Sequence, residues 1–282
     1  MVIALLFFLF IIGICVGSFL NVLIDRIPQG QSPLKGRSYC DHCRKSLAWY
    51  DMVPLFSSVF LKGKCRYCKL SISSYYPLVE LVTGLMFVLT FLYLSNQQLA
   101  TSNQFNNIII EQFNNLAINY IYYLFILSSF IVIFFTDLKY GIIPDKILYP
   151  AVLIFTIYHL PFTIYSPILN HQPSIINNIF SGMGAFLFFF LLYFITHGKG
   201  MGFGDVKLSF LLGLFLGFPK IIIALYTAFL TGAIIGSILI IWGKKKLRGT
   251  TIPFGPFLIL GAALSLFFGE FIIRLVLPWL NF

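Results

Sequence analysis

Long apolar runs recur along the whole chain, and they constrain the possible fold more than any other feature of the sequence. A membrane-spanning helix needs about 20 apolar residues, and somewhat fewer suffice where neighbouring protein covers it. By this measure the sequence predicts eight spans, at about 2–24, 78–95, 119–136, 146–162, 175–196, 205–218, 221–242 and 253–277. Only 10% of the residues are charged, whereas soluble domains contain about 25%. We therefore expect an all-α polytopic protein of the lipid bilayer.

Basic residues indicate how these spans are oriented. If the chain crosses the bilayer at each predicted span, 17 of the 19 Lys and Arg residues fall on one face, and only Lys220 and Arg274 do not. Loops rich in Lys and Arg stay in the cytoplasm, so this face is predicted to be cytoplasmic, with both termini outside. The net charge of +10 is explained by this rule, and we expect no nucleic-acid partner. We expect a first span at 1–24, a cytoplasmic loop at 25–77 and a seven-helix membrane domain at 78–282.

Four cysteines in the cytoplasmic loop have the spacing of a metal site. Cys40 and Cys43 form one C-x-x-C pair, and Cys65 and Cys68 form a second after 21 intervening residues. Two such pairs supply four thiolates for a tetrahedral zinc ion, in a pattern close to that of a zinc ribbon. Stable disulfides are not expected in the cytoplasm. We predict a structural zinc ion that folds the loop; a redox dithiol and unligated thiols are the alternatives.

Two acidic residues stand at the ends of apolar runs. Asp205 follows the glycine-rich segment that contains Gly202 and Gly204, and Asp137 ends the third predicted span. The predicted topology puts both carboxyl groups at the cytoplasmic side of the bilayer. Two carboxyl groups about 3 Å apart share one proton, as in aspartic proteases, and can activate water to attack an amide. This pair predicts peptide hydrolysis without metal or covalent intermediate.

Other acidic residues have structural explanations that must be weighed against function. Asp205 could cap a helix, since a carboxylate at a helix N-terminus accepts free amide N–H groups. Capping is the better interpretation of Asp145, which follows Pro144. Glu80, in the first turn of the second span, is open to a capping or a functional interpretation. Glu270 is expected to pair with Arg274 one helical turn away.

The motifs together resemble those of type IV prepilin peptidases, of the GxGD class of intramembrane aspartyl proteases. The resemblance covers nearly the whole chain, in six segments in the expected order. They are Gly17–Val22 with Arg26-Ile27-Pro28, the two cysteine pairs, Tyr76–Leu81, Asp137–Asp145 and Gly202–Lys207. Each motif is weak alone, but six in order are highly specific.

The resemblance implies cleavage of the short basic leader of type IV prepilins or pseudopilins, after a glycine and on the cytoplasmic side of the inner membrane of a bacterium. It implies that Asp137 and Asp205 are catalytic. Family members with the cysteine loop commonly also methylate the new N-terminal residue with S-adenosylmethionine. We attach that second site to the cytoplasmic loop, with Glu80 as a possible methyltransferase or substrate contact.

A proton- or cation-coupled transporter with a cytoplasmic zinc ribbon is the main alternative function. Transporters use intramembrane carboxylates near the middle of the bilayer and have internal symmetry between their halves. Here the two acids are predicted at one interface, and the similarity of Asp137-Leu138-Lys139 to Asp205-Val206-Lys207 is only faint. The sequence therefore favours the peptidase.

Overall fold

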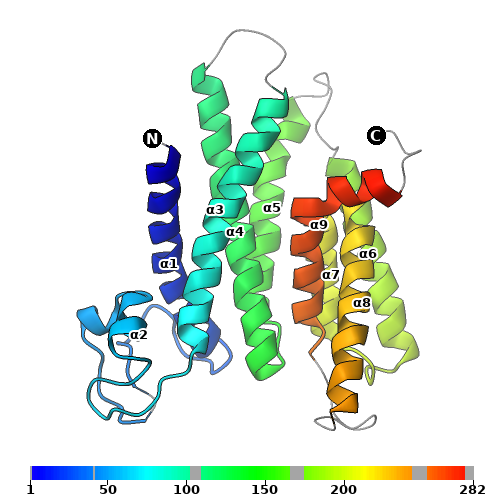
Figure 1. The fold of residues 1–282 in the computed structure, drawn as a ribbon. Coiled ribbons are helices and arrows are strands. Elements are labelled where there is room, and N and C mark those ends of the chain that lie inside the picture. The colour runs from blue at the N-terminus through cyan, green and yellow to red at the C-terminus, as the bar shows by residue number, and fades with distance from the viewer. Residues whose placement is uncertain (1, 41, 102–108, 166–174, 243–252, 277–282) are drawn as a thin grey trace. The chain divides into compact units, whose positions relative to one another are not determined.

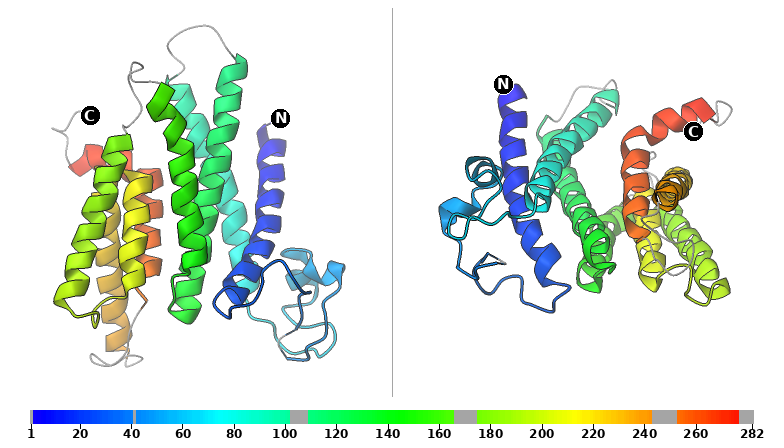
Figure 2. Two further views of the ribbon diagram at one scale, coloured as in Figure 1. Left: turned by 180° about the vertical axis from the view of Figure 1, so that it is seen from behind. Right: turned by 60° about the horizontal axis from the view of Figure 1, so that its bottom comes forward.

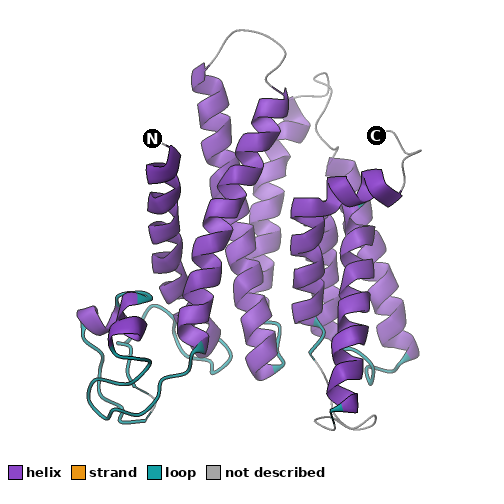
Figure 3. Ribbon diagram, viewed as in Figure 1, coloured by secondary structure: helices purple, strands orange, loops and turns teal. Residues whose placement is uncertain are grey.

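The computed structural model describes residues 2–40, 42–101, 109–165, 175–242 and 253–276 (Figure 1). Within these ranges the ordered elements are helices and two isolated β-bridges (Figure 3). The chain divides into two compact units, Met1–Val132 and Ile133–Phe282. The elements are α1 (Val2–Arg26), η1 (Trp49–Met52), α2 (Phe56–Phe60), α3 (Tyr75–Thr101), α4 (Ile109–Tyr140), α5 (Asp145–Tyr165), α6 (Ile175–Ile195), α7 (Phe203–Leu216), α8 (Lys220–Ile241) and α9 (Gly255–Val276).

Six of the described helices are long and apolar enough to cross a membrane. They correspond to six of the eight predicted spans and lie at Val2–Arg26, Tyr75–Gln97, Leu116–Tyr140, Ile175–Ile195, Lys220–Leu239 and Gly255–Leu275. The other two predicted spans form α5 and α7. The 14 residues of α7 extend only about 21 Å at 1.5 Å per residue, less than the hydrocarbon thickness of a bilayer. The fold class is thus confirmed as all-helical, with six candidate spans.

The first unit is built on close packing of α1 against α3, which Figure 2 shows side by side. Gly13 and Gly17 lie one turn apart on α1. A Cβ atom built on Gly13 would be 2.7 Å from the Cα of Gly84, and one built on Gly17 would be 2.7 Å from the Cα of Glu80. Small residues at this spacing let membrane helices approach closely. Both helices lead into the cysteine-bearing loop.

The second unit surrounds α7 with other helices. Leu208, Leu211 and Leu212 are fully buried on α7, which packs mainly against α6 and also contacts α5, α8 and α9. Gly213 permits the closest approach, because a Cβ atom there would lie 2.5 Å from the Ser181 carbonyl oxygen of α6. Since neighbouring helices cover α7, it can be apolar without being long enough to span a bilayer alone.

Candidate active site and metal centre

Asp137 lies in the last turn of α4, in the second unit. The helix ends because Gly141 adopts a left-handed φ of 67° and donates its N–H to the Asp137 carbonyl oxygen at 2.8 Å, a common helix C-terminus. The Asp137 side chain is buried, and its Oδ2 has no hydrogen-bond partner among the described residues. A buried carboxylate oxygen without a donor is costly and is available to a water molecule or a substrate.

Asp205 lies in the first turn of α7, where Gly202 is the N-cap residue. Its Oδ2 accepts the Gly202 N–H at 3.2 Å, so the predicted capping contact exists. A cap on a solvent-exposed helix end does not require burial, yet only 7% of Asp205 is exposed. Gly204, which directly precedes Asp205, and Gly255, which lies against Asp137, both approach the side chain of Ile143. The structure therefore brings together the two acids that the sequence singled out.

The side chain of Ile143 links the segments that carry the two acids. A Cβ atom built on Gly204 would lie 3.1 Å from the Cβ of Ile143, and one built on Gly255 would lie 3.4 Å from its Cδ1. Ile143 belongs to the connection between α4 and α5, whereas Gly204 and Gly255 lie in the first turns of α7 and α9. Three chain segments thus converge beside Asp137 and Asp205.

Gly255 was not predicted as a site residue. A Cβ atom built on it would lie 2.6 Å from Oδ2 of Asp137 and 3.2 Å from Cγ, so the backbone at the start of α9 lies directly against this carboxylate. The available signal was the sequence Pro253-Phe254-Gly255-Pro256, in which a glycine stands between prolines at the start of an apolar run. Gly202 and Gly204, predicted as supporting backbone, lie beside Asp205 and Ile143.

Lys207 and Asp145 form an ion pair next to the two buried acids. The Lys207 ammonium lies 2.9 Å from both carboxylate oxygens of Asp145, and Asp145 is the first residue of α5. The two residues are 62 positions apart in the sequence, so no local sequence pattern predicts this ion pair. Glu270 pairs with Lys220, at 3.1 Å, and not with Arg274, the partner predicted from helical spacing.

The four predicted cysteines come together in the first unit. Their Sγ atoms all lie within 4.8 Å of one another, and those of Cys40 and Cys68 are 3.9 Å apart. A tetrahedral zinc ion with sulfur at about 2.3 Å requires sulfur atoms about 3.8 Å apart. The backbone N–H of Cys68 lowers the pKa of the Cys65 thiol to about 7, and the thiolate is the ligand form. The donor set and its spacing fit a metal ion.

The two cysteine turns have the same backbone structure. In the first turn Cys40 N–H donates to the Lys45 carbonyl and Arg44 N–H donates to the Cys40 carbonyl, at 3.0 and 2.9 Å. In the second turn the equivalent bonds, Cys65 to Leu70 and Lys69 to Cys65, are both 2.9 Å. Arg44 and Lys69 have left-handed φ values of 58° and 59°. Each turn is followed by one isolated β-bridge partner, Ser46 or Ser71.

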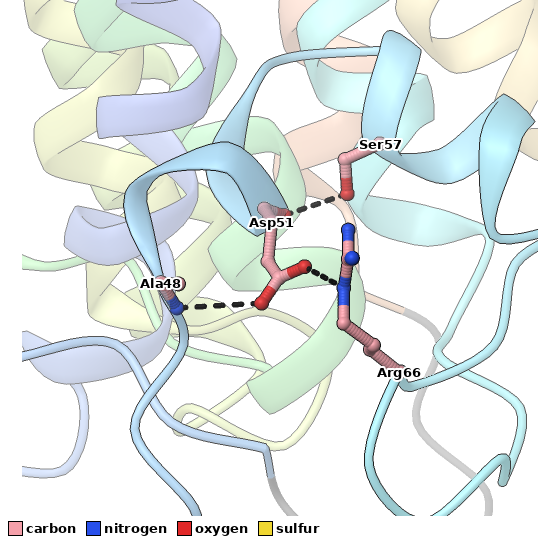
Figure 4. A network of polar contacts seen from close by, with 4 residues as sticks. All are labelled: Ala48, Asp51, Ser57 and Arg66. Carbon is pink, nitrogen blue, oxygen red and sulfur yellow. Dashed lines mark hydrogen bonds and ion pairs between the residues drawn. The ribbon is translucent and has the colours of Figure 1, made fainter.

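An ion pair between a buried carboxylate and a half-exposed guanidinium connects the chain between the two turns to the second turn (Figure 4). Arg66 Nε donates to Asp51 Oδ1 at 2.6 Å, and the Asp51 side chain is only 2% exposed. Ser57 Oγ donates to the Asp51 carbonyl at 2.6 Å, and Ala48 N–H approaches Asp51 Oδ2 at 3.4 Å. Because both Arg66 and Asp51 are bonded in this way, η1 and the start of α2 are held against the metal-binding turn.

Glu80 connects the loop to the membrane helices. Its Oε2 accepts the Leu55 N–H at 2.8 Å, and Gly17 of α1 packs against the Glu80 backbone. Leu55 has a left-handed φ of 59° and precedes α2. Glu80 is buried and therefore joins α1, α3 and the cysteine loop. Nearby, Asn21 donates to the Tyr76 carbonyl at 3.1 Å, and its buried Oδ1 accepts no hydrogen bond from the described residues.

Two family models match the sequence. The model of the bacterial peptidase A24 N-terminal domain matches residues 11–94, which include the four cysteines and Glu80. The model of the type IV leader peptidase family matches residues 124–237, which include Asp137 and Asp205. The two matched ranges therefore separate the loop site from the two acids.

Curated proteins named prepilin leader peptidase/N-methyltransferase are similar to this chain. The protein of Bacillus subtilis is 31% identical over 265 residues, which cover 94% of this chain and 95% of that protein. The protein of Aeromonas hydrophila is 28% identical over 94% of this chain and 91% of its own length. A shorter match to the protein of Myxococcus xanthus is 55% identical over 80 residues, 28% of this chain and 24% of that protein. No solved structure matches.

Proposed function

The chain belongs to the prepilin leader peptidase/N-methyltransferase family, and we propose that it is an intramembrane aspartyl endopeptidase in which Asp137 and Asp205 cleave the leader of a type IV prepilin or pseudopilin. The observation that carries this proposal is the burial of both carboxyl groups in one unit, beside chain segments that meet at the side chain of Ile143. The substrate class comes from the names of the related proteins.

The two acids would divide the chemistry as in other carboxylate pairs. One carboxyl group stays protonated and polarises the scissile carbonyl, while the ionised one takes a proton from water and makes it the nucleophile. Asp137 Oδ2, which has no donor among the described residues, is free to hold that water. Asp205 Oδ2 is fixed by Gly202, so its orientation is set before the substrate arrives. The proton shared by the pair passes to the leaving amine as the amide bond breaks.

We propose that cleavage follows a glycine at the cytoplasmic side of a bacterial inner membrane, with both termini outside. The distribution of Lys and Arg supports this orientation. A substrate with a basic leader and an apolar helix stops at that interface for the same electrostatic reason. The acids lie at the ends of α4 and α7 that this orientation assigns to the cytoplasmic side.

We further propose that the four cysteines hold a structural zinc ion. A site closed by four sulfur atoms has no open position for catalysis, so the ion would fold a loop with little apolar core. Two of the proposed ligands, Cys65 and Cys68, lie on either side of Arg66. Because Arg66 pairs with Asp51, a fixed metal site would also hold the part of the loop that contains Asp51.

Methyl transfer to the new N-terminal amine is the second proposed activity, with S-adenosylmethionine as the methyl donor when it is bound. The buried Glu80 carboxylate and the unbonded Asn21 Oδ1 are both acceptors, which suits a group that carries positive charge or N–H donors. Glu80 is also bonded to Leu55, so it would couple this site to the zinc loop.

The test is incubation of the purified protein with a prepilin and labelled S-adenosylmethionine, with cleavage and methyl transfer measured separately. Asp137→Asn and Asp205→Ala should each abolish cleavage, while both variants insert into the membrane and methylate a pre-cleaved pilin. Near-normal cleavage by either variant would refute the assignment of the acids. Loss of methyl transfer in Glu80→Gln, with cleavage retained, is expected from the second assignment.

A further inference from the structure

The ion pair between Lys207 and Asp145 is accessible and lies beside the segments that carry the two proposed catalytic acids. Half of the Asp145 side chain and 24% of the Lys207 side chain are exposed. Lys207 follows Asp205 by two positions, and Asp145 follows Ile143 by two. Because Ile143 lies against Gly204 and near Gly255, the pair belongs to the same convergence of segments as the two buried acids.

The exposed acids of this region are few. Apart from Asp137 and Asp205, the described part of the second unit contains two acidic residues, Asp145 and Glu270. Glu270 pairs with Lys220, which lies just after the C-terminal end of α7. Asp145 pairs with Lys207, which lies near the N-terminal end of α7. Asp145 is therefore the exposed carboxylate at the catalytic end of the described part of this unit.

A basic leader faces an unfavourable field on this side of the protein. On the topology proposed above, 17 of the 19 Lys and Arg residues lie on the cytoplasmic face, and like charges repel. The zinc loop alone has nine of them, so it offers no net attraction to a leader that carries Lys or Arg. A specific carboxylate close to the scissile bond would offset this repulsion.

We propose that Asp145 binds a Lys or Arg side chain of the leader, and that Lys207 occupies Asp145 until the substrate displaces it. This inference rests on the proposed peptidase function and adds the residue that selects the basic substrate. Exchange is feasible because exposed ion pairs have small net stability and one cation replaces another. The displaced ammonium retains the rings of Phe203 and Tyr149, which lie 5.4 and 5.5 Å from it and stabilise a cation.

The exchange makes a prediction of opposite sign for the two partners. Removal of the Asp145 charge should weaken binding of a basic leader, whereas removal of the Lys207 charge should strengthen it, because the competitor is gone. If the pair only orients α5 against α7, both changes should weaken binding of the leader peptide, whether or not that peptide is basic. The sign of the Lys207 effect therefore separates substrate recognition from structural positioning.

The experiment measures binding of fluorescent leader peptides to the full chain in lipid nanodiscs. All proteins carry Asp137→Asn to prevent cleavage, and two peptides are compared, one with its native Lys or Arg residues and one with Gln in their place. Asp145→Asn should reduce the preference for the basic peptide about fivefold, the upper range for exposed pairs. Lys207→Gln should increase that preference. Glu270→Gln is the matched control, because it breaks the exposed ion pair at the other end of α7 and should change nothing.

Equal affinity of the protein for the two peptides, or a Lys207→Gln effect in the same direction as Asp145→Asn, would overturn the inference. Whether the protein prefers the basic peptide can be decided even if Asp145→Asn fails to fold. The two peptides are then compared on the protein that retains Asp145 and Lys207. Binding is measured without catalysis, so its outcome is distinct from that of the proposed function. If the protein with Asp137 restored cleaves neither peptide, the peptidase proposal falls, whereas the binding result still decides the role of Asp145.

Discussion

Replacement of Gly255 by alanine should disable peptide cleavage without unfolding the protein. The Cβ atom of the alanine would lie 2.6 Å from Oδ2 of Asp137, where ordinary contact begins at about 3.4 Å. The atom in the way is the end of a flexible side chain rather than backbone, so the clash is relieved when the carboxylate moves. The fold can tolerate this movement, but the group that moves is one of the two proposed catalytic acids.

The size of the effect follows from the displacement. Relief of the clash requires movement of the Asp137 oxygen by about 0.8 Å, the difference between 3.4 and 2.6 Å. A misplacement of about 1 Å at a reacting group costs roughly 100-fold in rate. We therefore expect Gly255→Ala to reduce the rate of leader cleavage about 100-fold, with a smaller change in peptide affinity.

The assay compares single-turnover cleavage by Gly255→Ala and by Gly184→Ala in nanodiscs. Gly184 lies in α6 of the same unit, and a Cβ atom there would meet no heavy atom within 4 Å, so its variant should cleave at the wild-type rate. Thermal unfolding and bound zinc should be unchanged in both variants. A folded Gly255→Ala protein that cleaves within about threefold of the wild-type rate would refute the argument that this backbone positions Asp137.

Three further substitutions and one change of pH test the rest of the structure. Cys40→Ser should remove the bound zinc, as measured by elemental analysis. Acidification should release zinc from the wild type, because the thiolate ligands are protonated as the pH falls. The Cys65 thiol, whose pKa is lowered to about 7, is one of these ligands. Glu80→Ala leaves the Leu55 N–H without its acceptor, which costs about 1–3 kcal/mol, so limited proteolysis within residues 25–77 should accelerate at least fivefold or so. Gly213→Ala puts a Cβ atom 2.5 Å from backbone of α6, so the midpoint of thermal unfolding should fall; an unchanged midpoint would contradict the packing of α6 on α7.

The sequence predicted the parts of the fold that depend on composition and local spacing. Six of the eight apolar runs form helices that are both long and apolar enough to span a membrane, and the four cysteines meet as their spacing indicates. The run at 205–218 forms α7, which is too short to span a bilayer alone. Its residues are apolar because other helices bury them, and contact with lipid is not needed to explain their composition. Hydropathy does not distinguish these two causes.

Residues that meet only through tertiary structure were harder to predict. Asp137 and Asp205 were identifiable because an acid at the end of an apolar run is unusual in either place. Gly255 was missed because its role depends on the approach of α9 to the end of α4. The pair of Asp51 with Arg66 was missed as well, since neither residue has an unusual sequence context within a polar loop.

The matching hydrogen bonds of the two cysteine turns limit how much order a metal ion bound by the four cysteines would have to supply. Each turn is closed by its own backbone, through Cys40 with Lys45 and through Cys65 with Leu70. Two sulfur atoms are thereby oriented in each turn by the peptide alone, and the proposed zinc ion would fold the loop by joining these two turns. Chelation should then separate the two turns and disorder the loop between them, while the backbone hydrogen bonds within each turn remain.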